Sequence, residues 1–156
     1  MKQLQNETEW TKVAEVELLY KNTVKAAERP SIKTASDCYQ LLINTWDLNG
    51  IEVYEEFKVL LLNRANRVTG LYQLSKGGIC GTVADPRLVL AVALKSLSVG
   101  LVLAHNHPSG NLTPSIADRE LTTKMKVAAS YHDITILDHL VISNDSYYSF
   151  AENGLL

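Results

Sequence analysis

The feature that most constrains this 156-residue sequence is a short apolar run, Leu-Val-Leu-Ala at positions 101–104. The residues before it, 86–98, carry apolar side chains at helical spacing, and a polar loop, 106–113, follows it. Four continuous apolar residues bounded in this way are typical of a strand that is buried on both faces. The run therefore predicts a sheet covered on its two sides rather than one open to water.

The rest of the chain alternates between the periods of strands and helices. Asp85 and Pro86 stand where the N-cap and the first residue of a helix belong. Asn63 begins a predicted turn between two strands, and Gly100 is expected to end the helix before it. The predicted strands are 14–20, 55–62, 67–75, 101–104, 134–142 and 147–150, and the predicted helices are 36–46, 86–98 and 115–131. This alternation predicts an α/β sandwich around a mixed β-sheet.

Length and composition fit one domain, 1–156, with a motif-bearing core at 55–156 and an N-terminal strand–helix extension at 1–50. The formal net charge is −2, without a long run of like charge. That balance argues against a protein that binds nucleic acid mainly by neutralising phosphates, although a local basic patch stays open. The two cysteines, Cys38 and Cys80, are expected to be small core residues.

Nothing in the sequence suggests a membrane protein. The first twenty residues lack the apolar stretch of a signal peptide. The most apolar segment, 88–104, is interrupted by Lys95, Ser96, Ser98 and Gly100. These interruptions favour a buried helix, a turn and a buried strand over a membrane span. We expect a cytoplasmic protein.

Two histidines follow the apolar strand directly. Residues i and i+2 of an extended chain project to the same face, so His105 and His107 should point the same way. Asp118, in the first turn of the next helix, can supply a carboxylate as a third metal ligand. Two imidazoles and one carboxylate leave the fourth position of a zinc ion open, which is the mark of a catalytic site.

Each half of this pattern also has a structural interpretation. Two polar residues at a strand end often belong to a hydrogen-bond network of the following loop. Ser115 and Asp118 form S-x-x-D, which by itself is more often a helix capping box than a metal motif. Their combination is much more specific than either part.

The combination resembles a known family. H-x-H, seven residues and then S-x-x-D is similar to the metal signature of the JAMM (MPN-type) metalloenzymes, and LAHNHPSGNLTPS and LDHLVI resemble their bacterial RadC branch. The resemblance covers 55–156. It implies a JAMM/MPN-type mixed sheet between helices, comparable to the cytidine-deaminase-like sandwich. It also implies a Zn²⁺-dependent hydrolase of amide, peptide or isopeptide bonds that acts on a peptide or protein substrate.

The resemblance also implies roles for single residues. His105, His107 and Asp118 match the zinc ligands, and Ser115 matches the serine that helps to stabilise the oxyanion. The family's general base is a glutamate on an upstream strand.

Two glutamates stand side by side at that place, Glu55 and Glu56. Alternation puts them on opposite faces of the strand, and Glu56, which shares its face with Lys58, is expected to lie toward solvent. RadC-like sequences carry E-x-F before an apolar run, which here selects Glu55 with Phe57. We therefore expect Glu55 to be the base.

Two other functions stay open. The first is a DNA repair or processing factor, as RadC-like proteins are often labelled; the first fifty residues show no Gly-rich helix-hairpin-helix segment that would contact DNA. The second is a non-catalytic MPN-type interaction module, although such modules usually lack the ligands present here. Of the remaining histidines, His132 is expected to be exposed, and His139 to be a core group or a partner of a ligand rather than a fourth ligand.

Overall fold

The computed structural model describes residues 19–78 and 82–156 of the chain. Its centre is a five-stranded mixed sheet with the strand order β2-β1-β3-β4-β5. Neighbouring strands are antiparallel except β3 and β4, which are parallel and connected through a helix. The strands are β1 Glu56–Leu62, β2 Val68–Lys76, β3 Gly100–Asn106, β4 Thr135–Ile142 and β5 Tyr147–Ser149.

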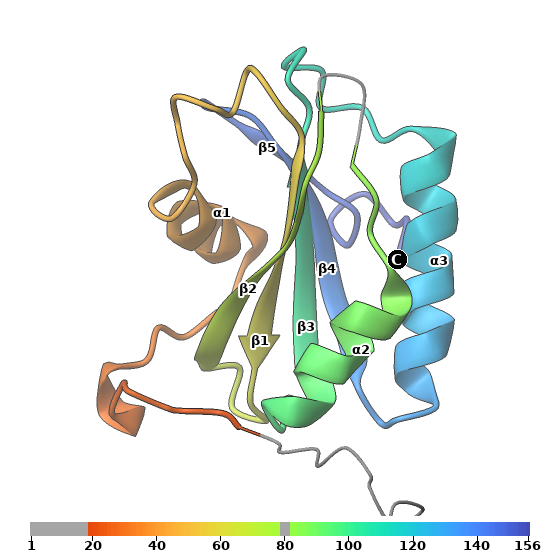
Figure 1. The fold of residues 1–156 in the computed structure, drawn as a ribbon. Coiled ribbons are helices and arrows are strands. Elements are labelled where there is room, and N and C mark those ends of the chain that lie inside the picture. Colours follow the sequence, from red (N-terminus) through yellow and green to blue (C-terminus); the bar gives the residue numbers. More distant parts are fainter. Residues whose placement is uncertain (1–18, 79–81) are drawn as a thin grey trace, which may run out of the picture.

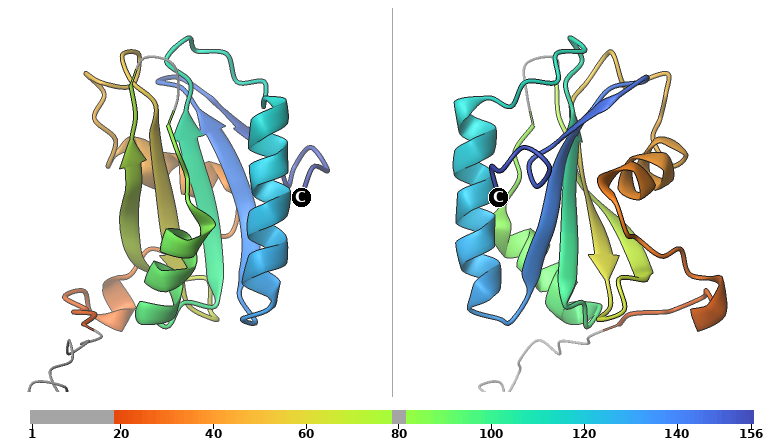
Figure 2. Two further views of the ribbon diagram at one scale, coloured as in Figure 1. Left: turned by 45° about the vertical axis from the view of Figure 1, so that its right-hand side comes forward. Right: turned by 180° about the vertical axis from the view of Figure 1, so that it is seen from behind.

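Helices cover both faces of this sheet (Figure 1). The helical segments are η2 Ala26–Glu28, α1 Ala35–Ile43, α2 Pro86–Lys95 and α3 Ile116–Ser130. The views in Figure 2 show α1 on one face and α2 and α3 on the other. The predicted α/β sandwich with a mixed sheet is thus confirmed.

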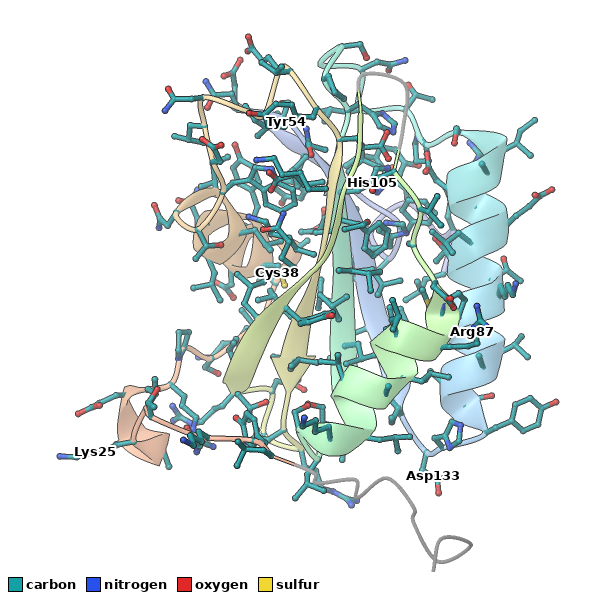
Figure 3. All side chains as sticks on the ribbon, viewed as in Figure 1. Lys25, Cys38, Tyr54, Arg87, His105 and Asp133 are labelled. Atoms are coloured by element: carbon teal, nitrogen blue, oxygen red, sulfur yellow. The ribbon has the colours of Figure 1, made fainter. Side chains whose placement is uncertain are left out.

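The core consists of two apolar clusters, one on each side of the sheet. Leu60 and Val102 pack toward α1, whereas Val59 and Leu103 pack toward α2 and α3. Every residue of β1 and β3 is buried, which confirms the prediction for the apolar run 101–104 of β3. Because side chains alternate along β3, His105 lies on the side of α3 and Asn106 on the side of α1. Figure 3 shows His105 near one end of the sheet and Cys38 on α1.

Helix starts follow their capping residues. Asp85 caps α2 by accepting a hydrogen bond from Arg87 N, and Pro86 is the first helical residue, as predicted. Ser115 caps α3. The predicted start of the first helix at Ser36 is wrong, because Thr34 is the N-cap and forms a complete capping box with Asp37.

Other predicted boundaries need correction. The helix predicted to run to residue 98 ends at Lys95, and Gly100 already belongs to β3. Helix α2 is also less buried than its apolar sequence suggests, since Leu88 and Leu94 are about half exposed. Its amphipathic pattern buries only Val89 and Ala93 completely.

Some predictions concern residues at the edge of the described parts. The strand predicted at 14–20 lies outside them except for its last two residues, which are not in a strand. Cys38 is buried as expected, and burial raises the pKa of its thiol to about 12. Cys80 lies outside the described residues. Within the described parts, no helix is long and apolar enough to cross a membrane.

Candidate metal centre

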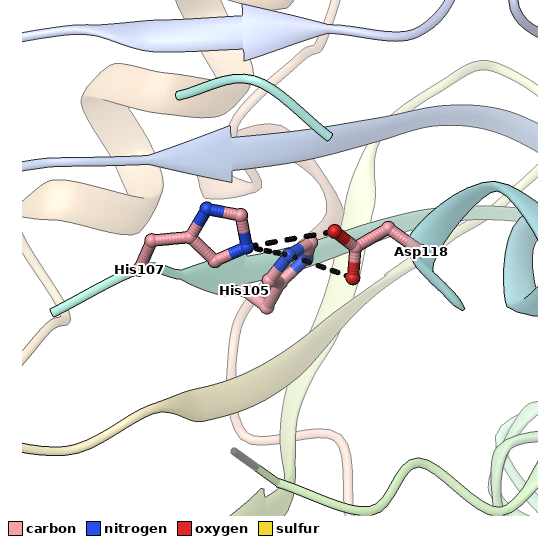
Figure 4. Close-up of side chains that lie close together, drawn as sticks. All are labelled: His105, His107 and Asp118. Carbon is pink, nitrogen blue, oxygen red and sulfur yellow. Dashed lines mark hydrogen bonds and ion pairs between the residues drawn. The ribbon is translucent and has the colours of Figure 1, made fainter. Parts of the chain in front are cut away.

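Three side chains from two neighbouring segments converge at the end of β3. His105 is its penultimate residue, His107 follows one residue after the strand, and Asp118 lies in the first turn of α3. Figure 4 shows the two imidazoles and the carboxylate facing one another. The three predicted ligand residues are thus brought together as one group that could hold a metal ion.

The spacing of the donor atoms fits a small cation. The Nε2 atoms of His105 and His107 are 3.0 Å apart, and His105 Nε2 lies 3.2 Å from Asp118 Oδ1. His107 Nε2 lies 3.5 Å from Asp118 Oδ2. A tetrahedral zinc ion with bonds of about 2.0–2.1 Å would separate its ligands by roughly 3.3 Å. Two nitrogens and a carboxylate are also the donor types that zinc accepts, so the residues fit the group that the resemblance implies.

The carboxylate of Asp118 serves two partners with its two oxygens. Oδ2 accepts hydrogen bonds from the backbone N and the hydroxyl of Ser115, both at 2.7 Å. In return, Ser115 Oγ accepts from Asp118 N at 3.1 Å, which completes a capping box. The capping role and the metal role of this aspartate are therefore compatible, because Oδ1 remains directed toward His105.

Each imidazole is oriented by its second nitrogen. His107 Nδ1 lies 2.6 Å from the carbonyl oxygen of Asn111 and must carry the proton of that hydrogen bond, since a carbonyl only accepts. His105 Nδ1 lies 2.8 Å from His139 Nε2. Both rings therefore present Nε2 to the shared centre, as metal-binding histidines do when another group holds Nδ1.

The contacts between Asp118 and the two histidines shift the pKa values of Asp118 and His107. Burial raises the pKa of Asp118, but its hydrogen bonds with His105 and His107 outweigh burial and hold this pKa far below its ordinary value. The hydrogen bond with Asp118 raises the pKa of His107 against the effect of burial. In the metal-free protein, the ionised carboxylate of Asp118 thus favours the protonated form of His107.

Glu55 lies close enough to this cluster for the charges of His105, His107 and Asp118 to act on its pKa. It directly precedes β1, and two residues later the ring of Phe57 stacks on the ring of His105, with centroids 5.9 Å apart. Burial raises the pKa of Glu55, and the charges of His105 and His107 lower it in part. A half-buried carboxylate on the same face as the histidines is suitably placed to exchange a proton with a group held between them.

Glu56 lies on the opposite face and has another role. Its carboxylate pairs with Lys58 at 3.4 Å and with Lys76 at 3.1 Å. Glu56 and Lys58 are only 2% and 4% exposed, so the prediction that this glutamate lies toward solvent is wrong. The ammonium of Lys58 also lies 4.1 Å from the ring centre of Trp46. The sequence placed Glu56 and Lys58 on one face but did not reveal their burial, because the loop after α1 with Thr45 and Trp46 covers Lys58.

The residue between the two histidines ties them to the strand of the glutamates. Asn106 is completely buried on the α1 side of β3. Its Oδ1 accepts from Glu56 N at 2.7 Å, and its Nδ2 donates to the carbonyls of Ile51 and Tyr54 at 2.7 and 2.9 Å. Asn106 thereby fixes the loop that ends at Glu55, a role that the H-x-H pattern did not indicate.

The other histidines lie where the sequence suggested. His132 is exposed at the end of α3, and His139 is completely buried beside His105. His139 also contacts Thr122 at 2.6 Å, a residue that sequence reasoning missed. The helical period does place Thr122 one turn after Asp118 and could have pointed to it.

A polar cleft of about 320 Å³ opens beside His107. Its walls come from three loops that meet at this end of the sheet. The lining residues are Ile51, Glu52, His107, Pro108, Ser109, Gly110, Ser143, Asn144 and Asp145. Of the three candidate ligands, His107 is the one that lines this cleft.

Comparisons with known proteins agree with this geometry. The family model described as RadC-like JAB domain matches residues 32–155. A UPF0758 protein of Flavobacterium johnsoniae is 52% identical over 102 residues, which are 65% of this chain and 44% of that protein. UPF0758 protein YeeS of Escherichia coli is 45% identical over 102 residues, which are 65% of this chain and 69% of that protein.

A UPF0758 protein of Porphyromonas gingivalis is 44% identical over 103 residues, which are 65% of this chain and 45% of that protein. The chain thus spans less than half the length of the Flavobacterium and Porphyromonas relatives. The family match covers most of the present chain, including the two histidines, Asp118 and both glutamates. It confirms the resemblance drawn from the H-x-H and S-x-x-D motifs. This chain belongs to the RadC-like JAB domain family, a branch of the JAB/MPN proteins.

Proposed function

We propose that this protein is a zinc-dependent hydrolase of an amide, peptide or isopeptide bond. The observation that carries the proposal is the convergence of His105, His107 and Asp118 near Glu55, with a polar cleft beside His107. Three protein ligands and an open position are the arrangement of catalytic rather than structural zinc sites. A non-catalytic module would not need a half-buried glutamate directed at its ligands.

The residues of the chain have separate roles in the proposed reaction. When bound, the metal supplies Lewis acidity, which in zinc hydrolases lowers the pKa of a coordinated water to about 7. Glu55 accepts a proton from the attacking water and returns it to the leaving amine, and its raised pKa suits both steps. His105, His107 and Asp118 hold the metal.

Ser115 is assigned to the oxyanion that forms at the scissile carbonyl. Its hydroxyl lies at the start of α3, 2.7 Å from the carboxylate of Asp118. A donor of this kind is typically worth about 3–4 kcal/mol of barrier when it is removed. The hydroxyl has one proton, which it donates to Asp118 in this structure, so its catalytic role requires that it turn toward the oxyanion while the backbone N–H of Ser115 still holds the carboxylate.

The substrate is a peptide or a protein. The cleft beside His107 has polar loop residues in its walls and two acidic side chains, Glu52 and Asp145. Such walls accept an extended backbone with its amide groups and disfavour a polyanion. We therefore assign the site to polypeptide rather than to nucleic acid.

The test is a cleavage assay with two defined substrate pools. Zinc-loaded protein is incubated with a proteome-derived peptide library and with synthetic peptides joined through lysine side chains, and mass spectrometry identifies new termini. We expect cleavage in one pool, which then distinguishes a peptidase from an isopeptidase. Chelation of the metal should abolish it.

Two variants provide the controls. Glu55→Gln should keep the metal and lose cleavage, and His107→Ala should lose both. Cleavage that persists in Glu55→Gln, or the absence of cleavage in both pools by fully metal-loaded protein, would contradict the proposed activity.

A further inference from the structure

A chain of buried hydrogen bonds leads from the candidate ligand His105 into α3. His105 Nδ1 contacts His139 Nε2 at 2.8 Å, and His139 Nδ1 contacts the hydroxyl of Thr122 at 2.6 Å. The hydroxyl of Thr122 in turn lies 2.6 Å from the backbone carbonyl of Asp118. The chain thus begins at one candidate ligand and ends at the backbone of another.

The direction of these hydrogen bonds can be derived from its last member. A carbonyl oxygen only accepts, so the single proton of the Thr122 hydroxyl is donated to Asp118 O. The hydroxyl must then accept from His139 Nδ1, which carries the proton of that ring. His139 Nε2 is left as an acceptor, and His105 must donate to it through Nδ1.

The surroundings leave little freedom for another assignment. Thr122, His105 and His139 are at most 2% exposed. The ring of Phe57 stacks on His105, and the ring of Phe150 stacks on His139 with centroids 4.7 Å apart. Because these residues are buried, the hydrogen-bonding groups of the two rings and the hydroxyl depend on one another as partners.

We propose that Thr122 and His139 are positioning residues that hold His105 with its proton on Nδ1 and thereby keep its Nε2 free to bind the metal. The proposal rests on the proposed metal centre. We call the chain of hydrogen bonds from His105 through His139 to Thr122 the tautomer lock, because it fixes the position of the proton on His105. A neutral imidazole carries one N–H, so fixing the proton on Nδ1 decides which nitrogen has the lone pair. The backbone carbonyl of Asp118 in α3 thus determines, through three successive hydrogen bonds, which nitrogen of His105 carries the proton.

Removal of the threonine hydroxyl should release the lock. In Thr122→Val, His139 Nδ1 has no acceptor, so the proton of His139 moves to Nε2 and is donated to His105. His105 then carries its own proton on Nε2, where it opposes the metal. Loss of such an outer partner typically weakens metal affinity about 10–100-fold.

The experiment measures the zinc dissociation constant by competition with a chelator for the wild type and three variants. Thr122→Val should bind zinc 10–100-fold more weakly, and Thr122→Ser, which keeps the hydroxyl, should bind like the wild type. Thr123→Val is the matched control, since Thr123 makes the same type of bond to a helix carbonyl, Arg119 O at 2.9 Å, but is exposed. A merely structural role of Thr122 would lower thermal stability without changing zinc affinity.

A second measurement needs no variant. Long-range ¹H–¹⁵N spectra of the zinc-loaded wild type should show the protons of His105 and His139 on Nδ1. Unchanged affinity in Thr122→Val, equal weakening in Thr123→Val, or a proton on His139 Nε2 would overturn the lock while the metal centre stands. A wild type that holds no zinc would overturn the metal centre and the lock with it.

Discussion

Asn106 Oδ1 accepts a hydrogen bond from the backbone N–H of Glu56 over 2.7 Å and so joins the strand of the histidines to the strand that follows Glu55. The same amide holds the loop before β1 through the carbonyls of Ile51 and Tyr54. The candidate ligands and the candidate base therefore share one rigid support. In this support, the residue between the histidines faces away from the metal and acts on the backbone.

Asn106→Asp should destabilise the protein. The substitution keeps the acceptor for Glu56 N but places a carboxylate oxygen against the two carbonyls that Nδ2 now bonds. Each buried group left without a partner costs about 1–3 kcal/mol. Urea unfolding measures the loss, and Asn144→Asp, at an exposed position, is the control. Equal stability of the two variants would show that the amide is not holding the loop.

Ser115→Ala should cost about 1 kcal/mol of stability through the lost N-cap, retain the metal and lose hydrolysis. Thr34→Ala is a matched control, because Thr34 caps α1 with the same capping box on the other side of the sheet. It should cost a similar amount of stability and leave hydrolysis unchanged. If both variants lose stability equally and both remain active, the serine is only a cap.

Glu55→Gln and Glu56→Gln should fail in different ways. The first removes the proposed base and should lower the hydrolysis rate roughly 10²–10⁴-fold at nearly unchanged stability. The second leaves Lys58 buried without its counter-ion. Removing one partner of a buried pair costs about 3–5 kcal/mol, of which the glutamine oxygen recovers a part. Rate measurements on the folded fraction, together with urea unfolding, separate the two effects. A slow but stable Glu56→Gln protein would reverse the assignment.

Stability of the metal-free protein should fall in mildly acidic solution. Burial lowers the pKa of His139 well below its ordinary value of 6.5, so below that pH the unfolded chain binds a proton that the folded chain does not. Unfolding is then favoured by up to about 1.4 kcal/mol per pH unit. The raised pKa of His107 acts in another window, since its stabilisation is lost as pH rises above 6.5.

Urea unfolding between pH 7 and about 5 measures this slope, and His139→Gln should reduce it because the titrating ring is gone. An equally steep loss in His139→Gln would assign the acid sensitivity to other groups.

The sheet and the cluster could be predicted from the sequence because their signals are local. The continuous apolar run of β3 identifies a strand buried on both faces, and the histidines follow it directly. Asp85 with Pro86 marks a helix start through the chemistry of the first turn. Asp118 could be assigned as a ligand because the spacing matched a known motif.

What the sequence missed depends on contacts between distant segments. The hydrogen bond of His139 with Thr122 joins residues 17 positions apart, and that with His105 joins residues 34 apart. The exposure of Glu56 was predicted wrongly because charged residues usually lie at the surface, whereas here Lys58 is buried together with the carboxylate and the exposed Lys76 pairs with it from outside. Alternation places Glu56 beside Lys58, and the helical period places Thr122 one turn after Asp118, but neither indicates that the ion pair is buried or that His139 lies between His105 and Thr122.

Metal stoichiometry tests the central claim most directly. The wild type and the variants His105→Ala, His107→Ala and Asp118→Ala are loaded with zinc, dialysed without chelator and measured by elemental analysis, with His132→Ala as a control at an exposed histidine. We predict one zinc per chain in the wild type and in His132→Ala, and little metal in the other three. Equal zinc content in all five proteins, or none in the wild type, would contradict a metal centre at His105, His107 and Asp118.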